Sequence, residues 1–283
     1  MITIVNSVNE VRSVVREWRR QGNTIGFVPT MGYLHDGHKS LIDRAVSECD
    51  KVVVSIFVNP MQFGPTEDLA QYPRDLDADS VLCENSGAHL IFHPESDEMY
   101  GNGFCSFVDM NGPTSALCGK SRPIHFRGVC TVVAKLFNIV QPDKAYFGQK
   151  DAQQLSVIRR MVADLNMPIE IVGCPIVRES DGLAKSSRNV YLNTEERKAA
   201  LVLSKSVFMG QAMVRDGELS ASALIAAMRE VIESEPLARI DYVEVVDAST
   251  IQPIETLKGE VLVAMAVYIG TTRLIDNFIV KID

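Results

Sequence analysis

The sequence contains no long hydrophobic run and no excess of basic residues. No apolar stretch approaches the roughly 20 residues needed to cross a bilayer, and the opening residues, MITIVNSVNEVRS, lack the basic start and apolar core of a secretion signal. We therefore expect a cytoplasmic protein with no membrane segment. Acidic residues outnumber basic residues by 36 to 28, which gives a formal net charge of −8. Because nucleic-acid affinity depends on clustered Lys and Arg, this balance favours a small-molecule substrate over a nucleic-acid partner.

The cysteine pattern argues against a disulfide-stabilised fold, because no C-x-x-C pair is present and the thiols are scattered along the chain. We expect them to be reduced and mostly packed in the interior. They are Cys49, Cys83, Cys105, Cys118, Cys130 and Cys174. At 283 residues the chain is long enough for about two domains, each with its own core.

The two common glycine-rich phosphate-binding motifs are also missing. No G-x-G-x-x-G sequence follows a predicted strand, which excludes the usual dinucleotide-binding fingerprint. The sequence Gly119-Lys120-Ser121 resembles the end of a P-loop, but the first glycine of that motif would fall at position 114, which is Thr114. The sequence therefore excludes a P-loop.

The chain does contain short apolar runs that alternate with helical patterns. Ser7 and Glu10 predict a capping box for a first helix that ends at Gly22. Nearly continuous apolar runs are typical of strands covered on both faces, and their alternation with helices predicts a parallel sheet. The predicted strands are 24–28, 52–58, 89–92, 145–147 and 169–174, the predicted helices are 39–47, 75–86, 128–140 and 155–165, and 104–109 has weak strand character. We predict an α/β fold, with a Rossmann-like nucleotide-binding domain at 1–176.

The composition changes in the last third of the chain. Asn193 with Glu196 predicts a capped helix to about residue 214, and a second helix is predicted at 220–234. The predicted strands of this part are 240–246, 261–269 and 273–280. Helices followed by antiparallel strands are typical of a small α+β domain, and we place a C-terminal α+β lid domain at 177–283.

A histidine-containing loop follows the strand predicted at 24–28. His35 and His38 stand where the next helix begins, and the free backbone N–H groups of a helix N-terminus suit a phosphate. Gly37 between them lets a ligand approach the backbone. Two histidines three apart are also compatible with zinc, but no Cys or His pair elsewhere completes a ligand set. A loop with a purely structural role stays open as an alternative.

Three further polar loops follow predicted strands. Asn59 and Gln62 could hydrogen-bond a small hydroxylated acid at the end of a parallel sheet where ligands bind. Lys150 lies in the loop of a second strand–loop–helix unit, with Gln154 one turn into the helix, and could neutralise phosphate charge. The segment 185–188 places a lysine, two hydroxyls and an arginine in consecutive positions, which suits a loop that closes over a triphosphate. Taken separately, each is also compatible with an ordinary loop, a solvated lysine or a basic turn.

The order of these motifs resembles the HIGH and KMSKS elements of the class I nucleotidyltransferases and synthetases. Within that superfamily the chain is similar to the pantothenate synthetases (pantoate–β-alanine ligases). The segments that carry the similarity are PTMGYLHDGH (29–38), VSIFVNPMQFGPTEDLAQYPR (54–74), SRPIHFRGV (121–129), KLFNIVQPDKAYFGQKDAQQL (135–155), IRRMVADLNMPIEIVGCPIVRESDGLAKSSRNVYL (158–192) and RLIDN (273–277). Together they cover most of the chain in the same order as in the family.

The resemblance implies an ATP-dependent ligase. Enzymes of this family join (R)-pantoate to β-alanine with ATP and Mg²⁺ through a bound pantoyl adenylate, release pyrophosphate and then AMP, and are commonly cytoplasmic homodimers. His38 matches the family's proton donor, with His35 beside it, and Lys150 is the third candidate catalytic residue. Gln62 and Gln154 match the pantoate-binding residues, and Gln62 also serves β-alanine.

The resemblance also implies an ATP site with a wide set of residues. They are Met31, Gly32, Tyr33, Leu34, His35, Asp36, Gly37, His38, Gly148, Gln149, Lys150, Asp151, Val177, Lys185, Ser186, Ser187 and Arg188. Lys185 stands where the family more often has an apolar residue, and Gln149 where it often has Glu. Mg²⁺ is expected to be carried mainly by phosphate oxygens, so no dedicated metal site of protein ligands is predicted.

Three other functions fit parts of the pattern. Another nucleotidyltransferase of the superfamily would transfer a nucleotide to a phosphate and would not need two glutamines for pantoate. An aminoacyl-tRNA synthetase is disfavoured by the acidic chain. A catalytically silent nucleotide-binding regulator is expected to lack phosphate-handling groups, yet His35, His38, Lys150 and Arg188 are all present.

Overall fold

The computed structural model describes residues 2–65 and 67–283, which form two compact units. The first unit contains the chain up to Met110 together with Ile124–Gln149 and Val157–Pro175. The second contains Asn111–Pro123, Lys150–Ser156 and Ile176–Asp283. Two short segments that precede residue 176 therefore belong with the C-terminal part. The domain boundary expected between residues 176 and 177 stays a prediction.

The first unit is built on a parallel sheet, as predicted from the alternating strands and helices. The strands are β1 (Thr3–Val5), β2 (Ile25–Thr30), β3 (Lys51–Ile56), β4 (Leu90–Phe92), β5 (Lys144–Gly148) and β6 (Glu170–Cys174). Their order in the sheet is β1-β4-β3-β2-β5-β6, and every pair in it is parallel. The chain therefore moves from β2 through β3 toward one edge and later returns beside β2 as β5.

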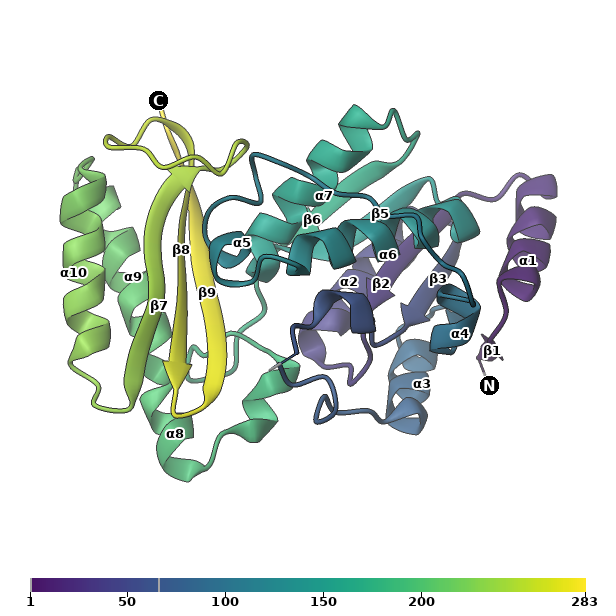
Figure 1. The fold of residues 1–283 in the computed structure, drawn as a ribbon, viewed down its shortest axis with the longest axis horizontal. Helices are drawn as coiled ribbons and strands as arrows, with labels where there is room; N and C mark the ends of the chain where they lie inside the picture. The colour runs from purple at the N-terminus through teal and green to yellow at the C-terminus, as the bar shows by residue number, and fades with distance from the viewer. Residues whose placement is uncertain (1, 66) are drawn as a thin grey trace. The chain divides into compact units, whose positions relative to one another are not determined.

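Helices cover both faces of this sheet (Figure 1). They are α1 (Val8–Arg20), α2 (Asp36–Glu48), α3 (Leu76–Asn85), α4 (Ser96–Met99), α6 (His125–Val140) and α7 (Ala152–Asp164), whose first turn belongs to the second unit. Successive strand residues point to opposite faces. Val28 of β2 belongs to the same buried cluster as Ile42 of α2, whereas Phe27 and Phe147 both make ring contacts with Phe137 of α6. Burial on both faces explains why these strands read as continuous apolar runs.

The second unit is a three-stranded antiparallel sheet with helices, in agreement with the predicted α+β composition. Its strands are β7 (Ala238–Asp247), β8 (Gly259–Ile269) and β9 (Thr272–Ile282), in that order, and its helices are α5 (Cys118–Ser121), α8 (Thr194–Ala199), α9 (Leu201–Arg215) and α10 (Ala221–Glu233). Helices α9 and α10 lie side by side on one face of the sheet (Figure 1). Met228 and Phe278 are buried in their shared core, while Leu117 and Tyr242 belong to a separate cluster that includes β7 and β8.

Several boundaries differ from the predicted ones. Strand β2 continues through Pro29 to Thr30, and this is possible because its pairing with β5 ends at Phe27, before the position without an N–H group. Helix α6 begins at His125, three residues earlier than predicted. The helix predicted from Asn193 to about residue 214 is two helices, α8 and α9, that meet at Ala200.

The weak strand expected at 104–109 does not form. The Val108 N–H donates to Oγ1 of Thr131 in α6 over 3.0 Å, so this part of the segment bonds to a helix side chain instead of a neighbouring strand. Among the described residues, no helix combines the length and apolar character required to span a bilayer.

Candidate active site

The polar segments predicted to bind substrates follow neighbouring strands of the parallel sheet. The loop after β2 leads to His35, the turn after β3 contains Asn59 and Gln62, and β5 leads to Gln149. In the sheet, β2 lies between β3 and β5. Because parallel strands end at the same edge, these three segments start from one edge of the first unit. The chain turns in opposite directions from β2 and β5, which is the position where open α/β sheets bind ligands.

The two histidines form a capping box at the start of α2. His35 is the N-cap residue, and its Nδ1 accepts from the Gly37 N–H over 3.1 Å, while Nδ1 of His38 accepts from the His35 N–H over 3.3 Å. The ring centroids are 4.1 Å apart. Because each Nδ1 is an acceptor, the neutral imidazoles carry their proton on Nε2. The local structure thus converts both side chains into Nε2–H donors at a helix N-terminus, where backbone dipoles also favour an anion.

A buried carboxylate holds the loop that precedes these histidines. Asp79 of α3 is 3% exposed, and its oxygens accept from the backbone N–H groups of Tyr33, over 2.8 Å, and Leu34, over 2.6 Å. Burial raises the pKa of Asp79, and the two N–H donors oppose that shift because they favour the charged form. Gly32 has a φ of 83°, and an added Cβ would lie 2.9 Å from Ile56 Cγ2, so this turn requires glycine.

Asp79 is not among the residues predicted from the sequence, although the sequence contains a signal for it. Leu76, Asp79 and Cys83 follow the three- and four-residue spacing that marks the buried face of a helix. A carboxylate on such a face needs hydrogen-bond donors from another part of the chain. The sequence alone does not reveal that these donors come from the loop after β2.

Asn59 holds Gln62 in place through a complete set of hydrogen bonds. Its Nδ2 donates to Gln62 Oε1 over 3.0 Å and to the Gly128 carbonyl over 3.2 Å, and its Oδ1 accepts from Met61 N–H and from the Tyr100 hydroxyl. Asn59 is only 1% exposed. All four hydrogen-bonding positions of the amide are therefore used inside the protein. Gln62 is also buried and donates from Nε2 to the sulfur of Met31, 3.1 Å away, which brings the segments after β2 and β3 together.

The N-terminal turn of α6 packs against the backbone of Gln62. Nδ1 of His125 lies 3.0 Å from the Gln62 carbonyl oxygen. At Gly128, an added Cβ would lie 2.3 Å from the Met61 carbonyl oxygen and 2.6 Å from the Gln62 Cα. Glycine at this position therefore lets the helix backbone contact the short 3₁₀ turn η1 (Pro60–Gln62) directly.

The other predicted residues, apart from Gly148 and Gln149, lie in the second unit. Lys150 is in the 3₁₀ turn η2 (Gln149–Asp151), and its carbonyl accepts from Nδ2 of Asn277 over 2.7 Å. Gln154 is half-buried in the first turn of α7. Its neighbour Gln153 is 6% exposed and bonds within the unit, to the Pro113 and Ala116 carbonyls and the Cys118 N–H, which is a structural role.

The basic segment follows a small hairpin, residues 177–185. Its arms are joined by an antiparallel bridge between Arg178 and Ala184 and by a hydrogen bond of 2.9 Å from the Lys185 N–H to the Val177 carbonyl. Ser186 then caps the 3₁₀ turn η3 (Ser187–Tyr191), accepting from the Arg188 N–H over 3.3 Å. The fold thus brings Val177 next to Lys185 and orders the backbone of the serines and the arginine.

The predicted site residues are divided between the two units. The first contains 31–38, Asn59, Gln62, Gly148 and Gln149, and the second contains Lys150, Asp151, Gln154, Val177 and 185–188. In the first unit, printed contacts join Gln62 to Met31 and His35 to His38, and in the second a hydrogen bond joins Lys185 to Val177. No group of three or more His, Cys, Asp or Glu side chains within the described ranges could hold a metal ion.

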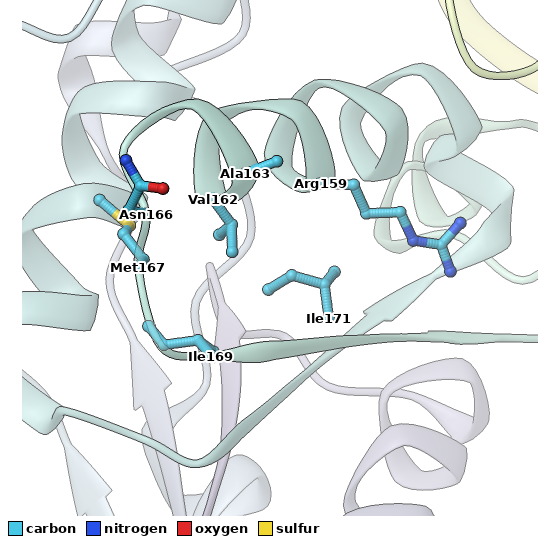
Figure 2. A pocket seen from close by; sticks show the side chains of 7 residues that line it. All are labelled: Arg159, Val162, Ala163, Asn166, Met167, Ile169 and Ile171. Carbon is cyan, nitrogen blue, oxygen red and sulfur yellow. The ribbon is translucent and has the colours of Figure 1, made fainter.

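An open hollow between α7 and β6 has a volume of about 490 Å³ but contains none of the predicted residues. Figure 2 shows Arg159 at one end, Asn166 and Met167 at the other, and the side chains of Val162 and Ile171 between helix and strand. Most of its lining side chains are apolar, and it has no acid–base or phosphate-binding group apart from the single arginine. It does not offer the chemistry that the predicted site requires.

Comparisons with known proteins give one consistent result. The family model for pantoate-beta-alanine ligase matches residues 3–279. A pantothenate synthetase of Ruminiclostridium cellulolyticum is 64% identical over 274 residues, 97% of each chain, and one of Clostridium botulinum is 56% identical over 281 residues, 99% of this chain and all of the relative.

Solved structures agree. The pantothenate synthetase of Thermus thermophilus has a TM-score of 0.93 and 46% identity, covering 98% of this chain and 99% of that one. A pantoate-beta-alanine ligase of Francisella tularensis, solved with beta-gamma ATP and beta-alanine, has a TM-score of 0.80 and 33% identity, covering 98% and 97%. The chain therefore belongs to the pantoate-beta-alanine ligase family.

Proposed function

We propose that this chain activates (R)-pantoate with ATP in a site formed by the loops after β2, β3 and β5 together with the Lys185–Arg188 segment. The overall reaction is that of the family: an ATP-dependent ligase condenses pantoate with β-alanine through a pantoyl adenylate and gives pantothenate, AMP and pyrophosphate. The observation that carries the proposed site is the order of strands, since three neighbouring strands lead into the histidine, glutamine and lysine segments at one edge of the sheet.

The adenylation step needs positive charge and N–H donors more than it needs a nucleophile on the protein. The pantoate carboxylate attacks the α-phosphorus in line with the departing pyrophosphate, and negative charge develops on the phosphate oxygens. The Nε2–H groups of His35 and His38 are proposed to donate to those oxygens, with His38 as proton donor. Lys150 and the Lys185–Arg188 segment supply cationic and hydroxyl groups.

The remaining residues of the same segments are also proposed to contact ATP. They are Met31, Gly32, Tyr33, Leu34, Asp36, Gly37, Gly148, Gln149, Asp151 and Val177. The capping geometry at His35 supports this assignment, because it leaves the first turn of α2 ordered around Gly37, where no side chain obstructs a ligand.

The pantoate pocket is proposed to use the amides of Gln62 and Gln154, with Gln62 also contacting β-alanine. Asn59 was expected to contact substrate as well. Since its four hydrogen-bonding positions are filled by protein groups, we propose that Asn59 acts on pantoate indirectly, by holding Gln62. In the second half-reaction the neutral amine of β-alanine attacks the acyl carbon and AMP leaves, so the main requirement is to hold the amine close.

We also propose Mg²⁺ as the ion that accompanies ATP, a cytoplasmic location and a homodimeric state. The ion would be held mainly by phosphate oxygens, because Mg²⁺ usually binds through substrate phosphates and a few carboxylates. Sedimentation equilibrium tests the dimer. The expected mass is twice 31.2 kDa, and a mass of 31.2 kDa at all concentrations would rule the dimer out.

Exchange of labelled pyrophosphate into ATP tests the proposed function. Because adenylation precedes the entry of β-alanine, exchange is expected with pantoate and ATP alone and should stop when pantoate is omitted. Equal exchange without pantoate, or none in pure folded protein, would show that the proposed site does not form pantoyl adenylate.

A further inference from the structure

Two neighbouring polar residues of the edge strand β9, Asp276 and Asn277, are almost fully buried, with exposed fractions of 1% and 4%. A buried polar side chain is unfavourable unless it is hydrogen-bonded, so its partners indicate its role. Successive residues of a strand point to opposite faces of the sheet. These two neighbouring side chains therefore extend in opposite directions from β9. Asp276 contacts Arg178 of the hairpin that ends at Lys185, and Asn277 contacts Lys150.

Asp276 binds the base of the hairpin that precedes the basic segment. Nη1 and Nη2 of Arg178 lie 2.7 Å and 2.9 Å from the two carboxylate oxygens, a two-point geometry that fixes direction as well as distance. Arg178 also donates from Nη1 to the Gly182 carbonyl over 3.0 Å. Arg178 therefore links one arm and the turn of the 177–185 hairpin to β9, and the hairpin ends at Lys185.

Asn277 binds the main chain of the other cationic segment. Its Nδ2 donates to the Lys150 carbonyl oxygen over 2.7 Å. This contact fixes the backbone from which the lysine projects and does not involve the ammonium group. The Asn277 N–H also donates to Oδ1 of Asp276 over 2.8 Å, so the two attachments are linked to each other.

From this arrangement we infer that Asp276 and Asn277 are positioning residues that hold Lys150 and the Lys185–Arg188 segment at a fixed separation for the triphosphate. The inference rests on the proposed function, which assigns both segments to ATP. Flexible cations lose much of their effect because they must be ordered during the reaction, whereas rigidly supported ones are in place when charge develops. Neither residue is assigned a contact with substrate.

Asn277→Asp is the sharpest variant for the test. It preserves the shape of the side chain but replaces the Nδ2 donor with an oxygen that faces the Lys150 carbonyl. Asn138→Asp is the matched control, since Nδ2 of the exposed Asn138 in α6 also donates to a main-chain carbonyl, that of Ala134, over 2.8 Å. We expect Asn277→Asp to lower kcat for pantoate-dependent pyrophosphate exchange by about tenfold or more. The control should stay within about twofold of the parent.

The decisive measurement repeats the substitution in a Lys150→Ala background. If Asn277 acts only by positioning the Lys150 ammonium group, it has no further effect once that group is removed. Asn277→Asp should then change the residual exchange rate by less than about twofold. A residue needed only for folding would lower the rate by the same factor in both backgrounds. Asp276→Asn is measured likewise with and without Arg188→Ala, and if Asp276→Asn does not fold, the Asn277 series decides alone.

The outcomes separate this inference from the proposed function. Equal factors in the two backgrounds, or an unchanged kcat in Asn277→Asp, would overturn the positioning role and leave the proposed function intact. Full activity of Lys150→Ala by itself would instead remove Lys150 from the ATP site, and the positioning role of Asn277 would be overturned with it.

Discussion

At the scale of single residues, the two histidines have a structural and a chemical role that can be separated. Nδ1 of each ring completes the N-terminal cap of α2, and Nε2 carries the proton proposed to reach the phosphate. Alanine at either position removes both roles and also costs about 1 kcal/mol of cap stability at the N-cap. Substitutions that keep the cap but lack the ring isolate the chemistry.

His35→Asn and His38→Gln are such substitutions, because Asn is a good N-cap residue and Gln can complete a capping box from the third helical position. We expect each to lower the rate of pantoyl adenylate formation by about 10²- to 10³-fold, the usual loss when one oxyanion donor is removed. Thermal unfolding should change little. A variant that forms adenylate at the parental rate would show that its histidine does not contact the reacting phosphate.

Asp79 predicts a specific dependence of stability on pH. Its pKa is raised in the folded protein, so on raising the pH from about 3.9, the ordinary carboxyl value, the unfolded chain ionises first. The folded state then binds more protons than the unfolded state, and the contribution of Asp79 to the free energy of unfolding falls until the raised pKa is passed. Denaturant unfolding of the parent and of Asp79→Asn at several pH values measures this.

The difference between the two curves isolates Asp79, since other carboxylates contribute equally to both. As the pH rises from about 3.9 to the raised pKa of Asp79, the free energy of unfolding of the parent should decrease relative to that of Asp79→Asn. Asn offers only one acceptor oxygen to Tyr33 and Leu34, so one N–H group also loses its partner in the variant. A relative stability that is constant or rises with pH would contradict a raised pKa.

At the scale of elements, the packing of α6 against the turn η1 should determine the position of Gln62, although no residue of α6 is proposed to contact substrate. Gly128→Ala would place a methyl group 2.3 Å from the Met61 carbonyl oxygen, so helix and turn must separate. Gly64→Ala, in the same loop, would meet only Glu67 at an ordinary 3.5 Å. We expect Gly128→Ala to raise KM for pantoate about tenfold or more and to destabilise the protein by about 1–3 kcal/mol.

The control Gly64→Ala should change neither quantity by a comparable amount. Steady-state kinetics with varied pantoate, together with denaturant unfolding, provides both readouts. If Gly128→Ala left KM for pantoate unchanged, the position of Gln62 would not depend on its packing against α6.

The features that could be predicted from the sequence are those that depend on residues close together along the chain. The capping boxes of Ser7 with Glu10 and of Asn193 with Glu196 are both present, because each involves residues three positions apart. The exception at Pro29 is instructive, since whether proline can continue a strand depends on which neighbour that strand pairs with at that point. Such a neighbour comes from a distant part of the chain and leaves no local signal.

In the candidate site, too, local features could be predicted from the sequence and contacts between distant residues could not. The histidine loop, the glutamine turn and the basic segment could be predicted as candidate binding segments because their residue types suit phosphate or hydroxyl groups. The residues that support them could not, since Asp79 and Asn277 act through backbone groups more than 40 positions away. Every residue has a main-chain carbonyl, so the sequence does not show which residue accepts from the side chain of Asn277.

At the scale of the whole molecule, the residues proposed to bind ATP are divided between the two units. His35 and His38 belong to the first unit, and Lys150 with 185–188 to the second. Within the first unit, the order of strands brings the starts of the relevant loops to one edge. Within the second, β9 contacts the Lys150 carbonyl and Arg178 of the hairpin that ends at Lys185.

The most direct test is a crystal structure of the protein with pantoate and a non-hydrolysable ATP analogue. We predict a single nucleotide whose phosphate oxygens accept from Nε2 of His38 and from Nζ of Lys150, each within about 3 Å. A nucleotide bound in order at the start of α2, with Lys150 and the Lys185–Arg188 segment both out of reach of its phosphates, would contradict the account.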